Sequence, residues 1–197
     1  NLLGRMSGIA SSTAEWVSES EGVAVACTRK TAWGLLDKWA VHVGGGLTHR
    51  LSRSDALMIK ENDLAVLEPQ KDTVSAIRSV ISSIDLELSS PFTVLEVSKL
   101  EQATTGAKSW SEAQNLRGGG ERIVLLLDNM GPIACGEVDR ELRSMDLRSW
   151  CILEGSGGIV RRELPEWSSV SGVDVVSSSE VNMAARSMDI SMIIGGE

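Results

Sequence analysis

The stretch Arg122-Ile-Val-Leu-Leu-Leu-Asp-Asn129 holds five consecutive apolar residues followed at once by an aspartate. A strand that is buried on both faces has a continuous apolar run, whereas a strand with one solvent-facing side alternates polar and apolar residues. Strands of a parallel sheet are buried in this way because helices cover both faces. The stretch therefore predicts a central strand of a parallel sheet, with Asp128 at its carboxyl end.

Five other segments have a similar character, and helical patterns lie between them. These further predicted strands are Val23–Lys30, Asp55–Asn62, Phe92–Ser98, Trp150–Gly155 and Val173–Ser178. Helix-like spacings of three and four residues separate Val74, Ile77, Ile81 and Ile84. The polar stretch Lys99–Glu121 predicts a helix followed by a loop, and Pro132 suits the first turn of a helix that ends near Arg148.

A repeated order of strand, crossover and strand predicts an α/β domain, either a barrel or an open doubly wound sheet. No Gly-x-Gly-x-x-Gly motif follows the first strand, which weakens a dinucleotide-binding interpretation. Polar residues also gather where the predicted strands end, as ligand-binding residues do on one face of a barrel. These residues are Arg29, Lys30, Lys60, Glu96, Asp128 and Ser156. We therefore expect one barrel-like (β/α) domain over residues 1–197, similar to a TIM barrel, with mostly parallel strands and with a closed, open or incomplete sheet.

Composition excludes several classes of protein. The 197 residues are 42% hydrophobic and 23% charged, unlike a disordered tail, a collagen-like fibre or a small disulfide scaffold. The net charge of −8 argues against general nucleic-acid binding. No apolar run approaches the roughly 18 residues that a membrane helix needs, and no secretory signal is recognisable. Three cysteines without a Cys-x-x-Cys pair favour a reducing compartment, buried thiols and no structural zinc, so we expect a cytoplasmic protein.

Positive charge is concentrated in one part of this acidic chain. Between Arg29 and Lys60 there are six cations against two acids, Asp37 and Asp55. Such segregation indicates a concave site for a small anion, although chance clustering on a solvated face is an equally open explanation.

Three segments of this region bring the basic residues to strand ends or to the loop between them. The candidate residues are Arg29, Lys30, His49, Arg50 and Lys60. Arginine matches a carboxylate with two parallel hydrogen bonds, and lysine supplies a point charge for a second carboxylate or a phosphate. A flat ring with two adjacent carboxylates would need about this many donors. The alternative is that some of these side chains pair with nearby acids, and a single histidine is a weak signal.

Five motifs in order resemble those of quinolinate phosphoribosyltransferase, the carboxylating nicotinate-nucleotide pyrophosphorylase family. They are Thr28-Arg-Lys-Thr31, Gly44-Gly-Gly-Leu-Thr-His-Arg50, Leu51-Ser-Arg-Ser-Asp-Ala-Leu-Met-Ile-Lys-Glu-Asn62, Leu126-Leu-Asp-Asn-Met130 and Gly155-Ser-Gly-Gly-Ile159. The resemblance extends from Ser7-Gly-Ile-Ala10 to Met188-Asp-Ile-Ser191, and each motif alone is modest.

The resemblance implies an enzyme, a pentosyltransferase of NAD biosynthesis. Its reaction converts quinolinate and phosphoribosyl pyrophosphate into nicotinate mononucleotide, pyrophosphate and carbon dioxide, with Mg²⁺. The family's catalytic domain is a barrel-like α/β fold that follows a smaller α+β domain, which this sequence lacks. The resemblance also implies a homodimer or higher homo-oligomer in which that smaller domain lends a basic residue to the partner's pocket.

By the same resemblance, individual residues acquire expected roles. Substrate-binding residues matching those around the quinolinate carboxylates and ring are Arg29, Lys30, His49, Arg50 and Lys60. Expected catalytic residues are Lys30, Glu96 and Asp128, and the two acids match the pair near the ribose hydroxyls and the metal. Expected phosphate-binding residues are Ser156, Gly157, Gly158 and Ser179, where glycines let backbone amides approach a phosphate. For Glu96 and Asp128 the simpler explanation is a helix-capping or solvated carboxylate. For Ser156, Gly157 and Gly158 it is a plain turn.

The sequence departs from the family pattern at four places. Ser179 stands where a glycine is expected and Met183 where a histidine is expected, both beside the phosphate. Asp63 replaces a histidine, and Ala32-Trp-Gly34 replaces a Pro-Gly turn after Thr31. Two alternatives to the transferase therefore stay open: an inactive paralogue that binds an anionic metabolite or a partner chain, and a transferase for a related small carboxylate such as nicotinate.

Overall fold

The protein is described by a computed structural model that covers residues 1–85 and 91–195. Six strands form one sheet in which every pairing is parallel. The strands are β1 (Ala24–Cys27), β2 (Leu57–Ile59), β3 (Thr93–Val97), β4 (Ile123–Asp128), β5 (Cys151–Ser156) and β6 (Val175–Ser178). Each predicted strand is therefore present, and the apolar run of residues 123–127 lies near the centre of the sheet, between β3 and β5.

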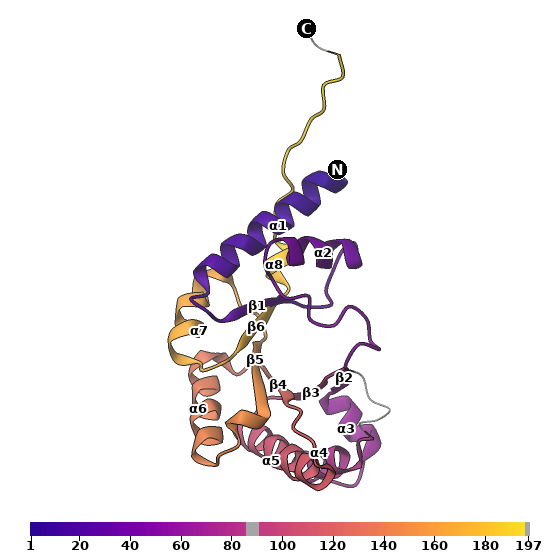
Figure 1. Ribbon diagram of the computed structural model, residues 1–197, viewed down its shortest axis with the longest axis vertical. Coiled ribbons are helices and arrows are strands. Elements are labelled where there is room, and N and C mark those ends of the chain that lie inside the picture. The colour runs from indigo at the N-terminus through magenta and orange to yellow at the C-terminus, as the bar shows by residue number, and fades with distance from the viewer. Residues whose placement is uncertain (86–90, 196–197) are drawn as a thin grey trace.

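The order of the strands is that of a barrel with one seam left open. The sheet runs β1-β6-β5-β4-β3-β2, so each strand from β2 onward pairs with the next strand in sequence. The pairing of β6 with β1 returns the sheet to its first strand, and β1 and β2 do not pair. The expectation of a barrel-like domain with an open or incomplete sheet is thus confirmed, and the opening lies between β1 and β2 (Figure 1).

Helices surround the sheet on its outer side (Figure 1). They are α1 (Leu2–Glu19), α2 (Leu35–Val43), α3 (Glu61–Leu67), α4 (Thr73–Ser83), α5 (Leu100–Arg117), α6 (Gly131–Ser144), α7 (Leu164–Val170) and α8 (Glu180–Met183), with 3₁₀ turns at Arg148–Trp150 and Arg161–Glu163. The predicted spacing in α4 is confirmed because Ile77 and Ile81 are fully buried. The helix that follows Pro132 ends at Ser144, four residues before the predicted end at Arg148, which instead begins a separate turn.

The sheet divides the core into two parts. Outward-pointing residues such as Leu95, Leu125 and Leu153 join the helices in the larger cluster. A smaller cluster fills the inside of the barrel and contains Ala56, Val94, Val124 and Leu126. Because side chains alternate along a strand, the inward positions beyond these apolar residues are Glu96, Asp128, Glu154 and Ser156. The interior is therefore apolar at one end of the strands and polar at the carboxyl end.

The two edge strands are shorter than predicted. The prediction of strand from Val23 to Lys30 was wrong beyond Cys27, and that of Asp55–Asn62 was wrong beyond Ile59. At both edges the chain leaves the sheet because β1 and β2 have no ladder between them to extend. At the second edge, the Asp63 carboxylate accepts a hydrogen bond from the backbone N–H of Lys60 at 2.9 Å, which starts α3 at Glu61.

The three cysteines are free and buried, as predicted. Burial raises the pKa of the Cys135 and Cys151 thiols to about 12, so neither is a thiolate near neutral pH. Over residues 1–85 and 91–195, none of the helices has both the length and the apolar character to cross a bilayer.

Candidate active site

A pocket of about 320 Å³ opens at the carboxyl end of the strands. It brings together side chains from the loop after β1, the segment before β2, and the ends of β2 to β6. Its lining comprises Thr28, Arg29, Lys30, His49, Arg50, Met58, Lys60, Glu96, Leu126, Asp128, Glu154, Ser156 and Ser177. All five predicted anion-binding residues and both predicted acids therefore meet in one place, as the sequence predicts.

Three of the pocket's basic residues have no acidic partner. Within the described parts of the chain, neither Arg29 nor Lys30 nor Arg50 forms an ion pair. Burial lowers the pKa of the Arg50 guanidinium, and the nearby charge of Arg29 lowers it further. The charges of Glu96 and Asp63 act in the opposite direction but do not outweigh these effects, so an anion gains free energy in this part of the pocket.

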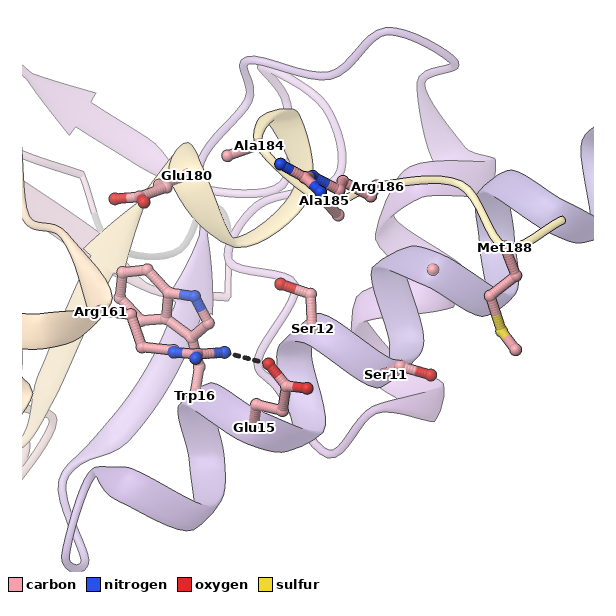
Figure 2. Close-up of a pocket in the computed structure, with 11 residues that line it drawn as sticks. Ser11, Ser12, Glu15, Trp16, Arg161, Glu180, Ala184, Ala185, Arg186 and Met188 are labelled. Atoms are coloured by element: carbon pink, nitrogen blue, oxygen red, sulfur yellow. Dashed lines mark hydrogen bonds and ion pairs between the residues drawn. The ribbon is translucent and has the colours of Figure 1, made fainter.

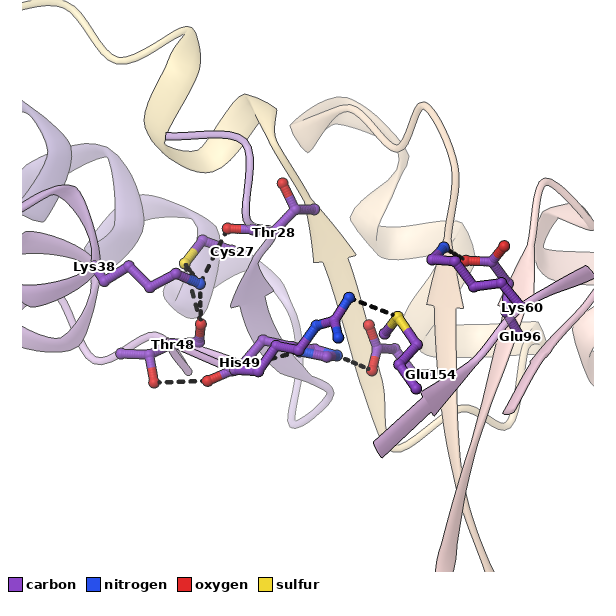
Figure 3. A network of polar contacts seen from close by, with 10 residues as sticks. Cys27, Thr28, Lys38, Thr48, His49, Lys60, Glu96 and Glu154 are labelled. Atoms are coloured by element: carbon purple, nitrogen blue, oxygen red, sulfur yellow. Dashed lines mark hydrogen bonds and ion pairs between the residues drawn. The ribbon is translucent and has the colours of Figure 1, made fainter. Parts of the chain in front are cut away.

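The other two basic residues do have carboxylate partners, as the alternative interpretation anticipated. Lys60 forms an ion pair with Glu96, and His49 contacts Glu154 with 2.9 Å between Nε2 and Oε2 (Figure 3). The backbone N–H of Arg50 donates to His49 Nδ1 at 2.8 Å. Since Nδ1 accepts, Nε2 carries the proton and donates it to Glu154. The imidazole is thus held in one orientation and one tautomer.

Glu154 was missed by reasoning from the sequence. It is 3% exposed, and its Oε1 is buried without a hydrogen-bond partner in the described structure. A buried carboxylate oxygen without a donor is costly, so such groups are concentrated at functional sites. The signal was present in Cys151-Ile-Leu-Glu-Gly155, where a single acid interrupts an otherwise apolar strand. Ser177, on neighbouring β6, was also missed and gives no comparable signal.

The two predicted acids lie on adjacent strands. Glu96 is near the end of β3 and pairs in register with Leu126, two residues before Asp128 on β4. The Asp128 carboxylate accepts a hydrogen bond from the Asn129 side-chain amide at 2.8 Å. Over the described residues, no group of three or more His, Cys, Asp or Glu side chains is arranged to hold a metal ion. Of the two predicted carboxylates, that of Glu96 is already paired with Lys60.

The predicted phosphate-binding residues are only partly within the pocket. Ser156 lines it, whereas Gly157, Gly158 and Ser179 are not among its lining residues. Gly158 has φ +65° and free space around its Cα, so its backbone is accessible. Gly157 has φ +102°, and a Cβ there would lie 2.3 Å from Asn129 Oδ1, which explains why only glycine fits.

The departures from the family pattern have different structural consequences. Ser179 has φ −75° and ψ −18°, a helical conformation that any residue can adopt, so serine causes no backbone strain there. Met183 is 52% exposed, at the end of α8, and does not line the pocket. Asp63 takes a structural role as the cap of α3.

A buried polar network supports the loop that carries Arg29 and Lys30. Asp37 on α2 receives two hydrogen bonds from the Arg5 guanidinium, at 3.1 and 2.9 Å, and one from the backbone N–H of Ala32 at 2.9 Å. The Asn182 amide donates to the carbonyl of Lys30 at 3.0 Å. Residues of α1, α2 and α8 therefore hold the turn after Thr31 in place. Arg5, Asp37 and Asn182 are too far apart in sequence for spacing to reveal this network.

A second cavity, between α1 and the segment around α8, does not have this character (Figure 2). Two arginines line it, Arg161 and Arg186, together with the carboxylates of Glu15 and Glu180. Arg161 forms ion pairs with Glu15 and Glu19 on α1. Because the two lining arginines are matched by two lining carboxylates, this cavity does not have the cluster of cations found in the pocket at the strand ends.

Comparison with known proteins agrees with this location of the site. Residues 9–193 match the family model described as quinolinate phosphoribosyl transferase, C-terminal domain. A probable nicotinate-nucleotide pyrophosphorylase [carboxylating] from Methanothermobacter thermautotrophicus is 33% identical over 205 residues, which cover 100% of this chain and 66% of that protein. Its counterpart from Archaeoglobus fulgidus is 33% identical over 198 residues, covering 98% of this chain and 69% of that protein.

A solved structure has the same fold. NadC from Streptococcus pyogenes superposes with a TM-score of 0.73 at 29% identity, covering 96% of this chain and 60% of that one. The chain thus spans about two thirds of the length of these relatives. It belongs to the quinolinate phosphoribosyl transferase family, of which it contains the C-terminal, barrel-like domain.

Proposed function

We propose that this chain is the catalytic domain of a carboxylating nicotinate-nucleotide pyrophosphorylase. The reaction transfers a phosphoribosyl group from phosphoribosyl pyrophosphate to quinolinate and releases pyrophosphate and carbon dioxide, leaving nicotinate mononucleotide. The observation that carries the proposal is a set of three cations in one pocket, Arg29, Lys30 and Arg50, that form no ion pair with any residue the structure describes. The names of the relatives in the same family support it.

The charge of the pocket fits a dianionic ring. Quinolinate has two adjacent carboxylates, and three unpaired cations can neutralise both, which favours it over a monocarboxylate such as nicotinate. Binding holds the ring nitrogen towards the ribose carbon from which pyrophosphate leaves. Fixing both reactants in this way can lower the activation free energy by about 7 kcal/mol or more in favourable cases. Lys30 is suited to stabilise charge as the bond to ribose forms.

The second step is the loss of one carboxylate. Once the ring nitrogen carries the ribose, its positive charge stabilises the electron pair left on the adjacent carbon when the bond to carbon dioxide breaks. A proton then adds to that carbon. The pocket suits this chemistry because its cations can hold both carboxylates of the ring in place until the bond breaks.

Glu96 and Asp128 fit a role as ligands to Mg²⁺. Magnesium takes oxygen ligands, keeps several waters and is typically held by one or two carboxylates together with substrate phosphates, so a larger protein cluster is not needed. The ion would neutralise the leaving pyrophosphate. The ion pair of Glu96 with Lys60 leaves Asp128 as the freer of the two carboxylates. Ser156 and the accessible backbone at Gly158 are suited to the 5′-phosphate, with Gly157 and Ser179 beside them.

We also propose that the protein works in the cytoplasm as a homo-oligomer. The outer side of α2 and the loops beside it expose Trp33, Leu36, Trp39, Val43 and Leu47. Apolar surface of this extent is typical of a protein–protein contact. Sedimentation equilibrium of the protein would test the oligomeric state, and a monomer at all concentrations would refute it.

The function is tested by incubating the protein with quinolinate, phosphoribosyl pyrophosphate and Mg²⁺ and measuring nicotinate mononucleotide and carbon dioxide. Equal amounts of both products are expected. Binding of quinolinate without product would favour the inactive paralogue, for which the replacements at Ser179 and Met183 are the supporting observation. Product from nicotinate but not from quinolinate would favour the related-substrate alternative.

A further inference from the structure

At the open seam of the barrel, backbone hydrogen bonds join β1 to the segment around Leu47 for only a short distance. Leu47 lies beside β1, where its N–H donates to the carbonyl of Val25 at 2.7 Å and its carbonyl accepts from the N–H of Cys27 at 3.0 Å. Among the described residues, no backbone hydrogen bond joins the two segments beyond this point. The next carbonyl groups, those of Thr28 and Thr48, would repel each other without a hydrogen-bond donor between them.

The ammonium of Lys38 occupies the place where the ladder stops. Its Nζ donates to the carbonyl of Thr48 at 2.5 Å and to that of Thr28 at 3.1 Å, and lies 3.7 Å from Cys27 Sγ (Figure 3). An ammonium has three donors, so all of them are used. One side chain from α2 thus joins the end of β1 to the segment that lies beside it at the open seam.

Burial of the Lys38 ammonium at this position carries a desolvation cost. It is 3% exposed and, within residues 1–85 and 91–195, has no carboxylate partner. Burial lowers the pKa of its ammonium, and the charges of Arg29 and Arg50 lower it further. Apolar residues of similar volume often stabilise a protein better than a buried charge does. Packing alone therefore does not account for a lysine.

The two carbonyls have a particular place in the sequence. Thr28 directly precedes Arg29 and Lys30, and Thr48 directly precedes His49 and Arg50. We propose that Lys38 is a positioning residue, whose ammonium holds the segment at Thr48 against the end of β1, at the open seam, and sets the distance between these two pairs of pocket side chains. Its consequence for quinolinate rests on the function proposed above. A pocket in which both pairs are fixed in advance loses less entropy when it binds a rigid dianion.

The seam itself is tested without any ligand. Lys38→Met removes the ammonium and keeps an unbranched apolar chain, and Lys108→Met makes the same change at an exposed lysine on α5. Hydrogen–deuterium exchange should increase in peptides covering 26–32 and 46–51 of Lys38→Met, with other peptides and the melting temperature close to those of the parent. Lys108→Met should exchange as the parent does. Unchanged exchange in those two peptides would overturn the proposal.

Calorimetric titration with quinolinate alone then tests the consequence. We expect Lys38→Met to bind about 10- to 100-fold more weakly than the parent, since charged hydrogen bonds from Lys38 orient the two pairs of pocket side chains. In Lys38→Ala, ethylammonium chloride should restore part of the binding, and potassium chloride at equal ionic strength should not. Parental affinity in Lys38→Met would overturn the positioning role.

The outcomes separate this inference from the function. If the parent fails to bind quinolinate while exchange rises in the two peptides as expected, the role of Lys38 at the seam stands and the proposed function is wrong. If both Lys38→Met and Lys38→Ala are unfolded, with and without ethylammonium, Lys38 is a folding residue and the proposal is overturned.

Discussion

His49 Nε2 and Glu154 Oε2 lie 2.9 Å apart, although 105 positions separate the two residues in the chain. The contact joins the segment in the open seam to β5, near the centre of the sheet. It fixes the ring of a histidine with φ +51°, a conformation that non-glycine residues rarely adopt. The pocket is therefore assembled by contacts between segments that are distant in the sequence.

Two substitutions of Glu154 distinguish its orienting effect on the His49 ring from the effect of its negative charge. Glu154→Gln keeps an acceptor for His49 and removes a negative charge beside the expected dianion, so quinolinate should bind at least as tightly as to the parent. Glu154→Leu leaves the His49 N–H without a partner, which typically costs about 1–3 kcal/mol of stability, and binding should weaken. Calorimetric titration and thermal unfolding of both variants measure these effects. Equal loss of binding in the two variants would contradict an orienting role.

Arg50→Ala should weaken quinolinate binding about 10- to 100-fold, because it removes a charged, planar donor that has no acidic partner. The matched control is Arg53→Ala, three positions away on the same loop, where the arginine is exposed and does not line the pocket. Both variants lose one positive charge, so only a local role distinguishes them. The two are compared by titration at the same ionic strength, and parental affinity in Arg50→Ala would refute the pocket assignment.

Asp128→Asn should reduce turnover and leave quinolinate binding within about threefold of the parent, because the carboxylate is assigned to the ribose and metal side of the reaction. The Mg²⁺ concentration that gives half-maximal rate should rise. Steady-state rates measured over a series of Mg²⁺ concentrations give both quantities. A variant that keeps the parental rate and Mg²⁺ dependence would show that Asp128 has no such role.

The network behind the Arg29 loop predicts a dependence of stability on acid pH. Burial alone would raise the pKa of Asp37, but hydrogen bonds from Arg5, Ala32 and Asn182 outweigh it and hold this pKa below its ordinary value of 3.8. The stabilisation from the ionised carboxylate is thus fully present above pH 3.8 and is lost as the pH falls through the lower, folded-state pKa.

Asp37→Asn should therefore be less stable than the parent near neutral pH, and the difference should shrink as the pH falls below 3.8. Urea unfolding at a series of pH values measures it. Glu101→Gln, at an exposed residue on α5, provides the control for a change of one negative charge. A difference between Asp37→Asn and the parent that stays constant down to the lowest pH would contradict the linkage.

Much of the fold follows from local sequence. Continuous apolar runs such as 123–127 can be buried on both faces only within a helix-covered sheet, and strand–helix alternation then requires parallel strands. The polar residues at the strand ends were predictable as well, because parallel strands place their carboxyl ends on one side of the sheet. The strand ends identify Arg29, Lys30, Lys60, Glu96, Asp128 and Ser156, whereas the basic cluster and the family resemblance identify Arg50.

Tertiary structure alone decided where the sheet opens and which charges are compensated. The lengths of β1 and β2 depend on whether these strands pair with each other, and the residues of a strand do not indicate which other strand will lie beside it. Likewise Lys38 is an ordinary charged residue in the sequence and Glu154 is a single acid within an apolar strand. Only packing places Lys38 between the carbonyls of Thr28 and Thr48 and Glu154 beside His49. Local patterns set burial and direction, whereas pairing between distant segments is a property of the whole folded chain.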